Sequence, residues 1–358
     1  MVTITFYKGV FLLKGFKTAI IWVVAIVLIC GAMWFLASIN GLSVTRTVIT
    51  VDGSEITEGE YKFYVEMAKT LVLDEQGITD EAAAKEFLAN GTVDGKSAAD
   101  YIKEEALKQV TKYEYAVVKA KEAGISLTAE EREAARATDG LEEQIKSYGV
   151  SKEVYADVME KTYLVDKYYT YLTSANPDMF KVEDADIKKN VEDSYALVQH
   201  VLIMNSPQDG TEADENYAKD AKKKAEDVLA KAVAGEEFSN LISQYNEDPG
   251  MTNSPEGYLI TVDGYTLDGT GQMVSEFTNG AFAVKPGKVN PELIESAYGW
   301  HIIKRCVIPE THADYETIES SAKNYLVSEK FDAYLEAVLP NANIVKKDNI
   351  LNKVKVEY

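Results

Sequence analysis

Cysteine and histidine are scarce in this chain of 358 residues, which contains two cysteines and three histidines. Two cysteines exclude a disulfide scaffold and a cysteine-rich zinc site. Three histidines leave little material for a histidine-based metal centre, so we expect no metal and no cofactor. The chain holds 37 basic and 58 acidic residues, a formal charge of -21. Nucleic acid is therefore not an expected partner, because phosphate backbones attract Lys and Arg.

Acidic residues are missing altogether from the first 50 positions, whose charged side chains are Lys8, Lys14, Lys17 and Arg46. The remaining residues, 51–358, therefore hold 33 basic and 58 acidic side chains and carry a formal charge of -25. A basic, apolar head thus precedes a strongly acidic body. The body has ordinary globular composition, since the chain is 46% hydrophobic and 27% charged.

The head contains an uncharged apolar run of 22 residues at 18–39, and a helix needs ~20 residues to span the hydrocarbon core. Trp22 and Trp34 lie near its ends, where indole rings favour the membrane interface. Lysines precede the run and few cations follow it. The positive-inside rule then predicts a basic cytoplasmic segment at 1–17, a transmembrane helix at 18–39 and an extracytoplasmic body.

Two other interpretations of this run remain open. A cleaved signal peptide has a shorter apolar core of ~7–15 residues and a small-x-small exit, which residues 37–40 (ASIN) resemble only in part. A lipoprotein would need a small residue before the acylated cysteine, whereas Ile29 precedes Cys30. We favour the retained anchor. Cys30 then lies within the bilayer, and a bridge to Cys306 is not expected.

The first part of the body reads as helical. Residues 44–51 predict a strand, and the capping box Thr57-Glu58-Gly59-Glu60 opens a helix that runs to about Leu73. Apolar spacing predicts further helices at 98–123 and 151–172, and a second capping box at 128–131 opens a short helix. This region is rich in tyrosine, which we attribute to half-buried rings whose hydroxyl groups reach solvent. A cleft that binds unfolded chains is the alternative. Beyond residue 309, the sequence predicts a helix at 315–338 and weak strands at 343–345 and 354–356.

The pattern changes near residue 195. Strand-like runs and amphipathic stretches follow in the order β-α-α-β-α-β, which fits an α+β domain of roughly 110 residues. Two histidines, His200 and His301, lie in its first and last strands. A lone histidine in an apolar strand is usually structural, but two of them in one sheet can meet, so that one fixes the tautomer of the other.

Six blocks in this region resemble the parvulin-type peptidyl-prolyl isomerases. The family's S-H-I-L-V strand is matched by QHVLI at 199–203, and its Y-G-Y-H-I-I strand by YGWHII at 298–303. The other four matches lie between these two in the order the family has them: G-x-x-F-x-x-L at 235–241, G-D-L-G at 257–260, G-x-M-V-P-E-F with A-F at 271–282, and the turn PGKV at 286–289.

The flanking segments resemble PrsA-type and SurA-type foldases, in which N- and C-terminal segments build one chaperone domain around an inserted parvulin domain. Residues 48–57 (VITVDGSEIT) are similar to their V-N-G-x-x-I-T opening. The resemblance implies an α+β chain with a transmembrane helix, a mainly helical chaperone domain from 44–190 and 311–358, and an inserted FKBP-like parvulin domain at 195–309. In its anchoring the chain is closer to PpiD-type foldases.

The resemblance implies cis–trans isomerisation of Xaa-Pro bonds in unfolded, exported polypeptides, without a metal or redox cofactor. The family's polar site residues map onto His200, Asp248, His301 and Ser296. Its apolar substrate contacts map onto four further residues, Leu259, Met273, Phe277 and Phe282. Departures from the pattern ring the mouth of this site: Tyr258 and Ile260 in the G-D-L-G block, Ser275 in place of proline, and two prolines within 247–256.

A binding protein is the second hypothesis: a holdase chaperone whose tyrosine-rich helical domain acts on unfolded chains, with a weakly active parvulin domain that serves for peptide binding. A structural subunit of a secretion machine, without chain binding, is a remote third. The sequence names no client protein, and it leaves homodimer formation and the preference for the residue before proline open.

Overall fold

The computed structural model describes residues 46–207 and 215–358, which fold as two compact units. We call residues 182–326 the sheet unit, and residues 46–181 with 327–358 the helical unit. The predicted membrane helix at 18–39 and the basic segment at 1–17 lie outside the described residues. Within the described part, every helix is too short or too polar to cross a bilayer.

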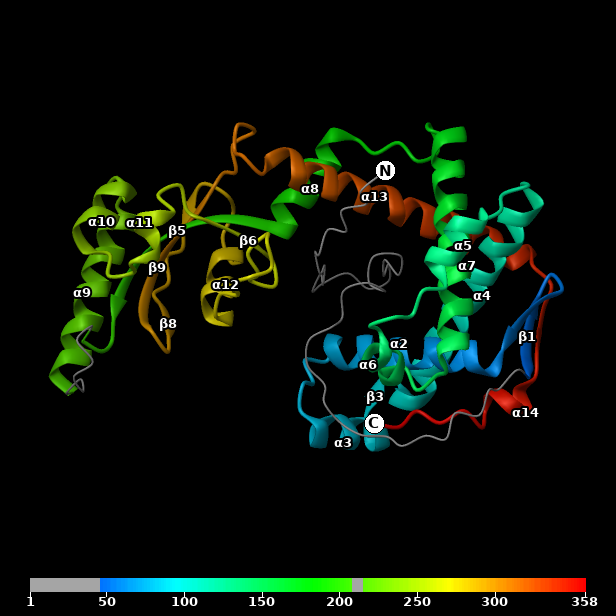
Figure 1. Cartoon of the computed structure of the whole chain (residues 1–358). Helices are drawn as coiled ribbons and strands as arrows, with labels where there is room; N and C mark the ends of the chain where they lie inside the picture. Colours follow the sequence, from blue (N-terminus) through cyan, green and yellow to red (C-terminus); the bar gives the residue numbers. More distant parts are fainter. Residues whose placement is uncertain (1–45, 208–214) are drawn as a thin grey trace. The chain divides into compact units, whose positions relative to one another are not determined.

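A three-stranded antiparallel sheet joins the two separate stretches of the helical unit. Strand β1 (Thr47–Val51) pairs on one side with β2 (Ser54–Thr57) and on the other with β10 (Ile344–Lys346). The β1–β2 hairpin turns at Asp52-Gly53, where both residues have positive φ, as a two-residue hairpin loop requires. Strand β10, from the second stretch of the helical unit, thus completes the sheet that β1 and β2 of the first stretch begin (Figure 1).

The other elements of the helical unit are mostly helices. The predicted capping box is present at Thr57, whose side chain accepts from the Glu60 N–H while the Glu60 carboxylate accepts from the Thr57 N–H. Helices α2, α4 and α7 make the core of this unit. The elements are α2 (Glu58–Glu75), α3 (Glu81–Asn90), β3 (Thr92–Val93), β4 (Lys96–Ser97), α4 (Ala98–Glu122), α5 (Ala129–Ala135), α6 (Glu142–Ser147), α7 (Lys152–Ala175), η1 (Leu339–Asn341) and α14 (Asp348–Leu351).

Many tyrosines of the helical unit are packed side chains. Tyr61, Tyr64, Tyr113, Tyr155 and Tyr168 are all buried. The rings of four of them, Tyr64, Tyr113, Tyr155 and Tyr168, lie beside another tyrosine or a phenylalanine, with centroids 5.7 to 6.2 Å apart. Packing therefore accounts for this part of the tyrosine content.

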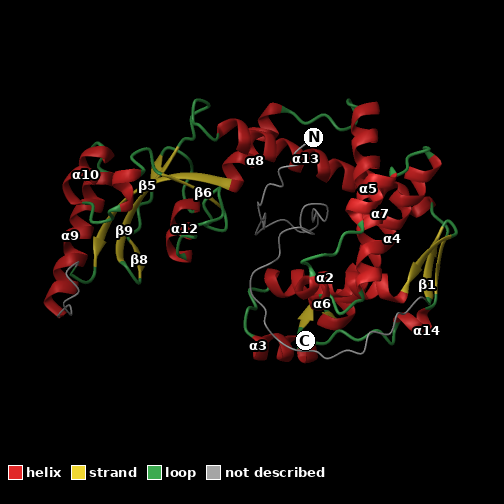
Figure 2. Ribbon diagram, in the orientation of Figure 1, coloured by secondary structure: helices red, strands yellow, loops and turns green. Residues whose placement is uncertain are grey.

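The sheet unit is built on an antiparallel sheet in the order β6-β5-β9-β7, with β8 paired to β9 (Figure 2). The long central pair, β5 and β9, is matched from Leu197–Cys306 to Met204–Gly299. The strands are β5 (Tyr195–Met204), β6 (Tyr258–Thr261), β7 (Lys288–Val289), β8 (Ile294–Ser296) and β9 (Gly299–Cys306). The helices are α8 (Asp184–Ser194), α9 (Glu215–Val233), α10 (Phe238–Tyr245), α11 (Gly250–Asn253) and α12 (Ser275–Phe282).

Alternation of side chains along β5 and β9 gives this sheet two different faces. Val201, Ile203 and Ile302 pack against α9 and α10 on one face. On the other face, Val198 and Ile303 pack against α12. The mixed helix and strand content confirms the predicted α+β class of the chain.

The boundaries of the two units differ from the predicted 190–195 and 309–311. They fall at residues 181/182 and 326/327, the second within helix α13 (Tyr315–Val338). Ile187 and Val191 of α8 pack with Ile318 and Ala322 of α13 against Tyr195 at the start of β5. This apolar cluster assigns α8 and the first half of α13 to the sheet unit.

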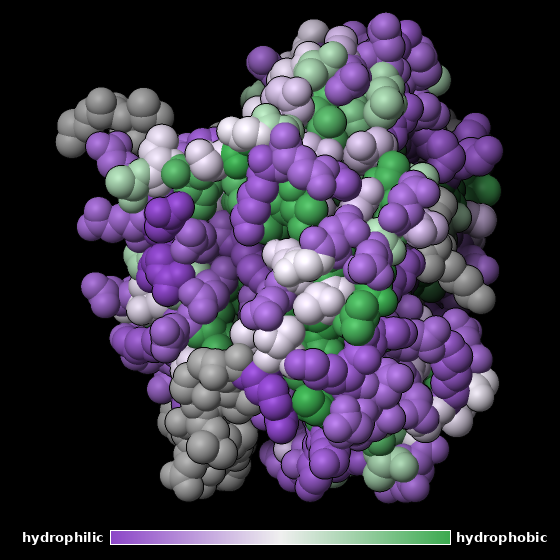
Figure 3. All heavy atoms as spheres, turned by 90° about the vertical axis from the view of Figure 1, so that its right-hand side faces the viewer, coloured by the Kyte–Doolittle hydropathy of each residue, from purple (hydrophilic) through white to green (hydrophobic). Residues whose placement is uncertain are grey.

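The part of the molecular surface seen in Figure 3 is mainly hydrophilic. On the face drawn in Figure 3, hydrophilic side chains predominate and apolar ones gather only in small groups. A formal charge of -21 favours solubility through mutual repulsion of copies.

Candidate active site

The two strand histidines lie on the same face of the central strand pair. His200 on β5 is opposite Ile303 of β9, and His301 on β9 is opposite Leu202 of β5. The histidines are therefore diagonal neighbours across the ladder, at a separation that long or aromatic side chains can bridge. Their Nδ1 atoms are 3.2 Å apart, and both residues are buried.

Two further polar residues extend this pair into a hydrogen-bonded series. His200 Nε2 lies 2.9 Å from Asp248 Oδ2. At the other end, His301 Nε2 lies 2.8 Å from Ser296 Oγ. The structure thus brings together Asp248, His200, His301 and Ser296, the four polar residues that the sequence singles out. Asp248 is the most exposed member, with a side chain 20% accessible against 4% for His200, so the series opens to solvent at the aspartate.

The loop that carries Asp248 is fixed to β5 by two residues that the sequence analysis missed. The Leu202 N–H donates to Asn246 Oδ1 over 2.9 Å, and the Met204 N–H donates to Glu247 Oε2 over 2.7 Å. Asn246 Oδ1 also accepts from the Asp248 N–H. The Asn-x-Asp spacing is a signal for such a turn, because Asn side chains bond backbone groups two residues on.

The electrostatics of the series favour one protonation pattern. The hydrogen bond with His200, aided by further hydrogen bonds from Tyr258 and Gly250, holds the pKa of the Asp248 carboxyl well below its usual range. Burial, and then the neighbouring His200, lower the pKa of His301 to about 4. At neutral pH Asp248 is therefore ionised and His301 is neutral.

An aromatic wall borders the histidines. The Phe277 ring on α12 meets His200 edge-on with centroids 5.0 Å apart, and His301 with centroids 5.5 Å apart. Phe277 is buried in the cluster that also receives Met273 and Phe282. Phe282 lies under the Arg305 guanidinium, 4.7 Å from ring centroid to the central carbon, which suits a supporting role.

Leu259, the remaining apolar candidate, is not brought to this wall. Its neighbours on β6, Tyr258 and Ile260, belong to the cluster around Phe277. Because side chains alternate along a strand, Leu259 faces the other way and packs against the cluster of α8 and α13 around Ile318.

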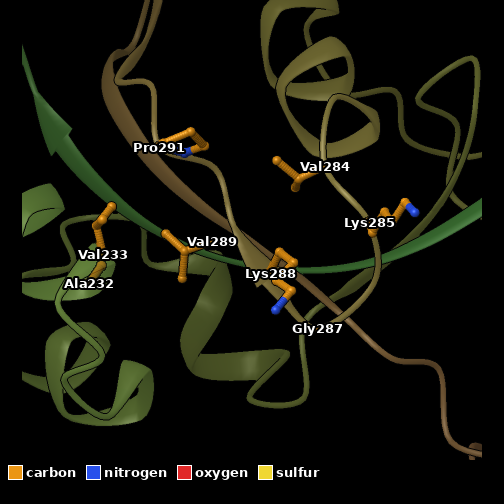
Figure 4. A pocket seen from close by; sticks show the side chains of 8 residues that line it. All are labelled: Ala232, Val233, Val284, Lys285, Gly287, Lys288, Val289 and Pro291. Atoms are coloured by element: carbon orange, nitrogen blue, oxygen red, sulfur yellow. The ribbon is translucent and has the colours of Figure 1, made fainter.

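A groove of about 440 Å³ lies elsewhere on the sheet unit. Figure 4 shows it between the end of α9, at Ala232 and Val233, and the turn that carries Val284 to Pro291. Its residues Ala232 and Val289 belong to the cluster on the α9–α10 face of the sheet. None of the four hydrogen-bonded polar residues lines it.

The chemistry open to the series is polarisation and proton positioning. Within the described residues, no three His, Cys, Asp or Glu side chains are arranged to hold a metal ion. Each histidine nitrogen in the series already has a protein partner. The arrangement therefore presents a fixed polar edge beside an apolar wall.

Comparison with known proteins agrees with this geometry. The family described as the PPIC-type PPIase domain matches residues 179–306. The foldase protein PrsA of Caldanaerobacter subterraneus is 28% identical over 301 residues, covering 81% of this chain and 85% of the relative. PrsA of Bacillus subtilis is 27% identical, covering 59% of this chain and 68% of the relative.

Among solved structures, the peptidylprolyl isomerase PrsA from Bacillus cereus aligns with 86% of this chain and 96% of its own, at 22% identity and a TM-score of 0.28. The family match covers both histidine strands and the Phe277 helix, and the relatives extend over both units. Residues 179–306 therefore form a parvulin-type peptidyl-prolyl isomerase domain, and the chain is similar to the PrsA foldases over both of its units.

Proposed function

We propose that the chain accelerates cis–trans isomerisation of Xaa-Pro bonds in exported proteins, and that the reaction takes place beside the His200–His301 pair. The observation that supports this best is the series of four buried or half-buried polar groups that ends in Asp248, with the Phe277 ring against both imidazoles. A polar edge and an apolar wall are the two features that a proline amide needs.

The reaction has a barrier of ~18–20 kcal/mol because rotation breaks amide resonance. An isomerase must bind the twisted amide more tightly than either planar form. In our proposal Met273 and Phe277 hold the proline ring, and Phe282 supports them from behind. Asp248, His200, His301 and Ser296 form the polar edge, with Asp248 nearest the substrate carbonyl. Leu259 is left out of the pocket because its side chain packs on the other face of β6.

The place of action is part of the proposal. Residues 18–39 form an uncharged run long enough to span a bilayer, preceded by three lysines. We infer a single retained span with the N-terminus in the cytoplasm and both folded units outside. Carbonate extraction of membranes from expressing cells tests the anchor, and protease protection of residues 46–358 in intact cells tests the orientation.

Chaperone binding to unfolded chains is assigned to the helical unit. Tyr163 and Tyr171 on α7 and Met179 beyond it are 37%, 48% and 54% exposed, unlike the packed tyrosines of the same unit. Exposed aromatic and methionine side chains offer adaptable apolar contact. We include formation of a homodimer in the proposal, and sedimentation velocity on the solubilised chain tests it.

Refolding of a protein whose slow phase is limited by proline tests the proposal as a whole. The wild-type chain is expected to shorten that phase, and His200→Ala is expected to lose the effect while still suppressing aggregation of the refolding protein. If the wild-type chain suppresses aggregation but never shortens the phase, the isomerase assignment fails and the chain acts as a holdase. If it does neither, both parts of the proposal fail.

A further inference from the structure

We propose that Tyr258 is a positioning residue of this site: its hydroxyl, with the backbone at Gly250, holds Asp248 in the orientation that sets the tautomers of both histidines. The inference rests on the proposed function and deepens it, because it adds a residue from the block in which this chain departs from the parvulin pattern. There Tyr258 stands where G-D-L-G has aspartate.

The carboxylate of Asp248 is held from three sides. The Tyr258 hydroxyl donates to Oδ2 over 2.7 Å, and His200 Nε2 lies 2.9 Å from the same oxygen. The Gly250 N–H donates to Oδ1 over 2.9 Å. A carboxylate held by two neutral donors in addition to an imidazole cannot rotate without breaking bonds to charged oxygen, which are among the stronger hydrogen bonds in proteins.

The strand register explains why a tyrosine reaches this point. Tyr258 is opposite Val198, two residues before His200 on the same face of β5. Its ring therefore lies beside the imidazole, with centroids 5.8 Å apart. From there the phenol oxygen extends past His200 to Asp248.

The direction of each proton follows from these contacts. The ionised Asp248 accepts from Tyr258 and from His200 Nε2–H, which leaves His200 Nδ1 bare. Across the 3.2 Å contact, His301 Nδ1 must then donate, and His301 Nε2 accepts from the Ser296 hydroxyl. With both imidazoles neutral, one tautomer of each satisfies every contact. The carboxylate at one end therefore determines the state of the serine at the other.

Space for the phenol oxygen depends on the absence of a side chain at residue 250. A Cβ built on Gly250 would lie 2.2 Å from the Tyr258 hydroxyl oxygen, which real structures essentially never show. Alanine at this position must shift the hydroxyl, and its Cβ would also lie 3.2 Å from Asp248 Oδ1. Tyr258→Phe therefore removes the hydroxyl contact alone, whereas Gly250→Ala disturbs both partners of that contact.

A role in packing alone is the alternative, because the Tyr258 ring also packs against the cluster around Phe277. Phenylalanine keeps that ring and loses only the hydroxyl, so Tyr258→Phe separates the two roles. A matched control is Tyr245→Phe. Its hydroxyl also has a side-chain partner, Lys231 Nζ at 2.6 Å, but the residue packs on the α9–α10 face away from the site.

The experiment uses the full-length chain in detergent micelles with imidazole-15N-labelled histidine. Since the chain has three histidines, each contributes a resolved signal pair whose shifts report the tautomer, and His312 serves as an internal reference. Isomerisation of a short Xaa-Pro peptide is measured on the same samples. Tyr258→Phe and Gly250→Ala are expected to move the His200 and His301 signals from single tautomers toward mixtures, and to lower kcat/KM about tenfold.

Unchanged His200 and His301 signals in both variants, with kcat/KM within twofold of wild type, would overturn the inference. The two proposals can fail separately. If the wild-type chain does not isomerise the peptide but Tyr258→Phe shifts both histidine signals, the positioning contact stands and the proposed function fails. If wild type is active and Tyr245→Phe shifts the signals as much as Tyr258→Phe does, the positioning role is refuted while the function stands.

Discussion

His200 and His301 share one hydrogen bond between their Nδ1 atoms, 3.2 Å apart, and their rings lie nearly parallel at an interplanar angle of 19°. A single proton occupies this contact when both rings are neutral. The tautomer of one ring therefore fixes which nitrogen of the other ring donates in this contact. A change of tautomer at one ring therefore alters the hydrogen bond that the other ring makes.

Ser296→Ala tests the inner end of the series. The Ser296 hydroxyl is the partner of His301 Nε2 at 2.8 Å in a buried place, and loss of a buried partner costs about 1–3 kcal/mol. We expect the free energy of unfolding to fall by about that amount and isomerisation to slow. Ser243→Ala, which removes an exposed hydroxyl bonded to the Ser239 carbonyl on α10, is the control and should change neither. Equal stability of the two variants would contradict the account.

The low pKa of His301 predicts acid sensitivity. The pKa of His301 is about 4 in the folded chain, against ~6.5 for a free imidazole. Between these two pH values the unfolded state binds more protons than the folded state. Stability is therefore full above about pH 6.5 and is lost as the pH falls toward about 4, by about 3 kcal/mol from this residue.

The measurement compares wild type with His301→Asn by denaturant unfolding at pH 7 and pH 4.5. Fluorescence of Trp300, the neighbour of His301 on β9, reports the sheet unit once Trp22 and Trp34 are replaced by phenylalanine. Because other carboxyl groups also titrate, the difference between the two chains is the relevant quantity. The same loss of stability in both chains would refute the role of His301.

The raised pKa of Glu329 on α13 predicts that the stability of the helical unit has the opposite pH dependence. Burial, together with nearby Asp332, raises the pKa of Glu329 to about 7, and its Oε1 has no hydrogen-bond partner among the described residues. A raised carboxyl pKa contributes stability that is present below about pH 4.5 and is lost as the pH rises through 7.

Glu329→Gln should therefore stabilise the chain at pH 8, by about 1 kcal/mol once the half-exposed position is discounted for solvent screening, and have little effect at pH 5. Thermal unfolding at the two pH values is the measurement, with the exposed Glu316→Gln on the same helix as control. A stabilisation that is equal at both pH values would show that charge is not the cause.

Arg305 links the start of the sheet unit to the loop behind Phe282. Its guanidinium donates to the carbonyls of Val284 and Tyr195 over 3.0 and 3.1 Å, and also to that of Glu192. Lysine cannot reproduce this planar fork. Arg305→Lys is expected to lower the free energy of unfolding by about 2 kcal/mol, measured by denaturant titration. A loss no larger than that of the exposed Lys285→Arg control would contradict this.

The parts of the fold that were predictable from sequence are those with a strong local signal. Helix α13 has the bounds that apolar spacing predicts, residues 315–338, and both T-x-x-E capping boxes are present, at Thr57 and Thr128. The juxtaposition of His200 and His301 was predictable as well, since both interrupt apolar strands of one sheet.

Other features depend on contacts that sequence patterns do not encode. The weak strand expected at 354–356 does not form, and β10 remains the edge of its sheet among the described residues. Helix α8 was missed because its apolar residues are few, and it is stabilised by packing against α13. Leu259 was mapped onto the substrate contacts by motif matching, whereas strand alternation turns its side chain toward the cluster around Ile318.

The most direct test of the central claim is exchange NMR on a short Xaa-Pro peptide with the full-length chain, beside His200→Ala. A reaction site beside the histidine pair predicts cis–trans exchange much faster than the uncatalysed event, which takes tens of seconds. It also predicts that His200→Ala loses this acceleration while circular dichroism shows an intact fold. Exchange as fast with His200→Ala as with wild type would contradict a reaction site beside the histidine pair. No acceleration by a folded wild-type chain, across several residues before proline, would contradict catalysis itself.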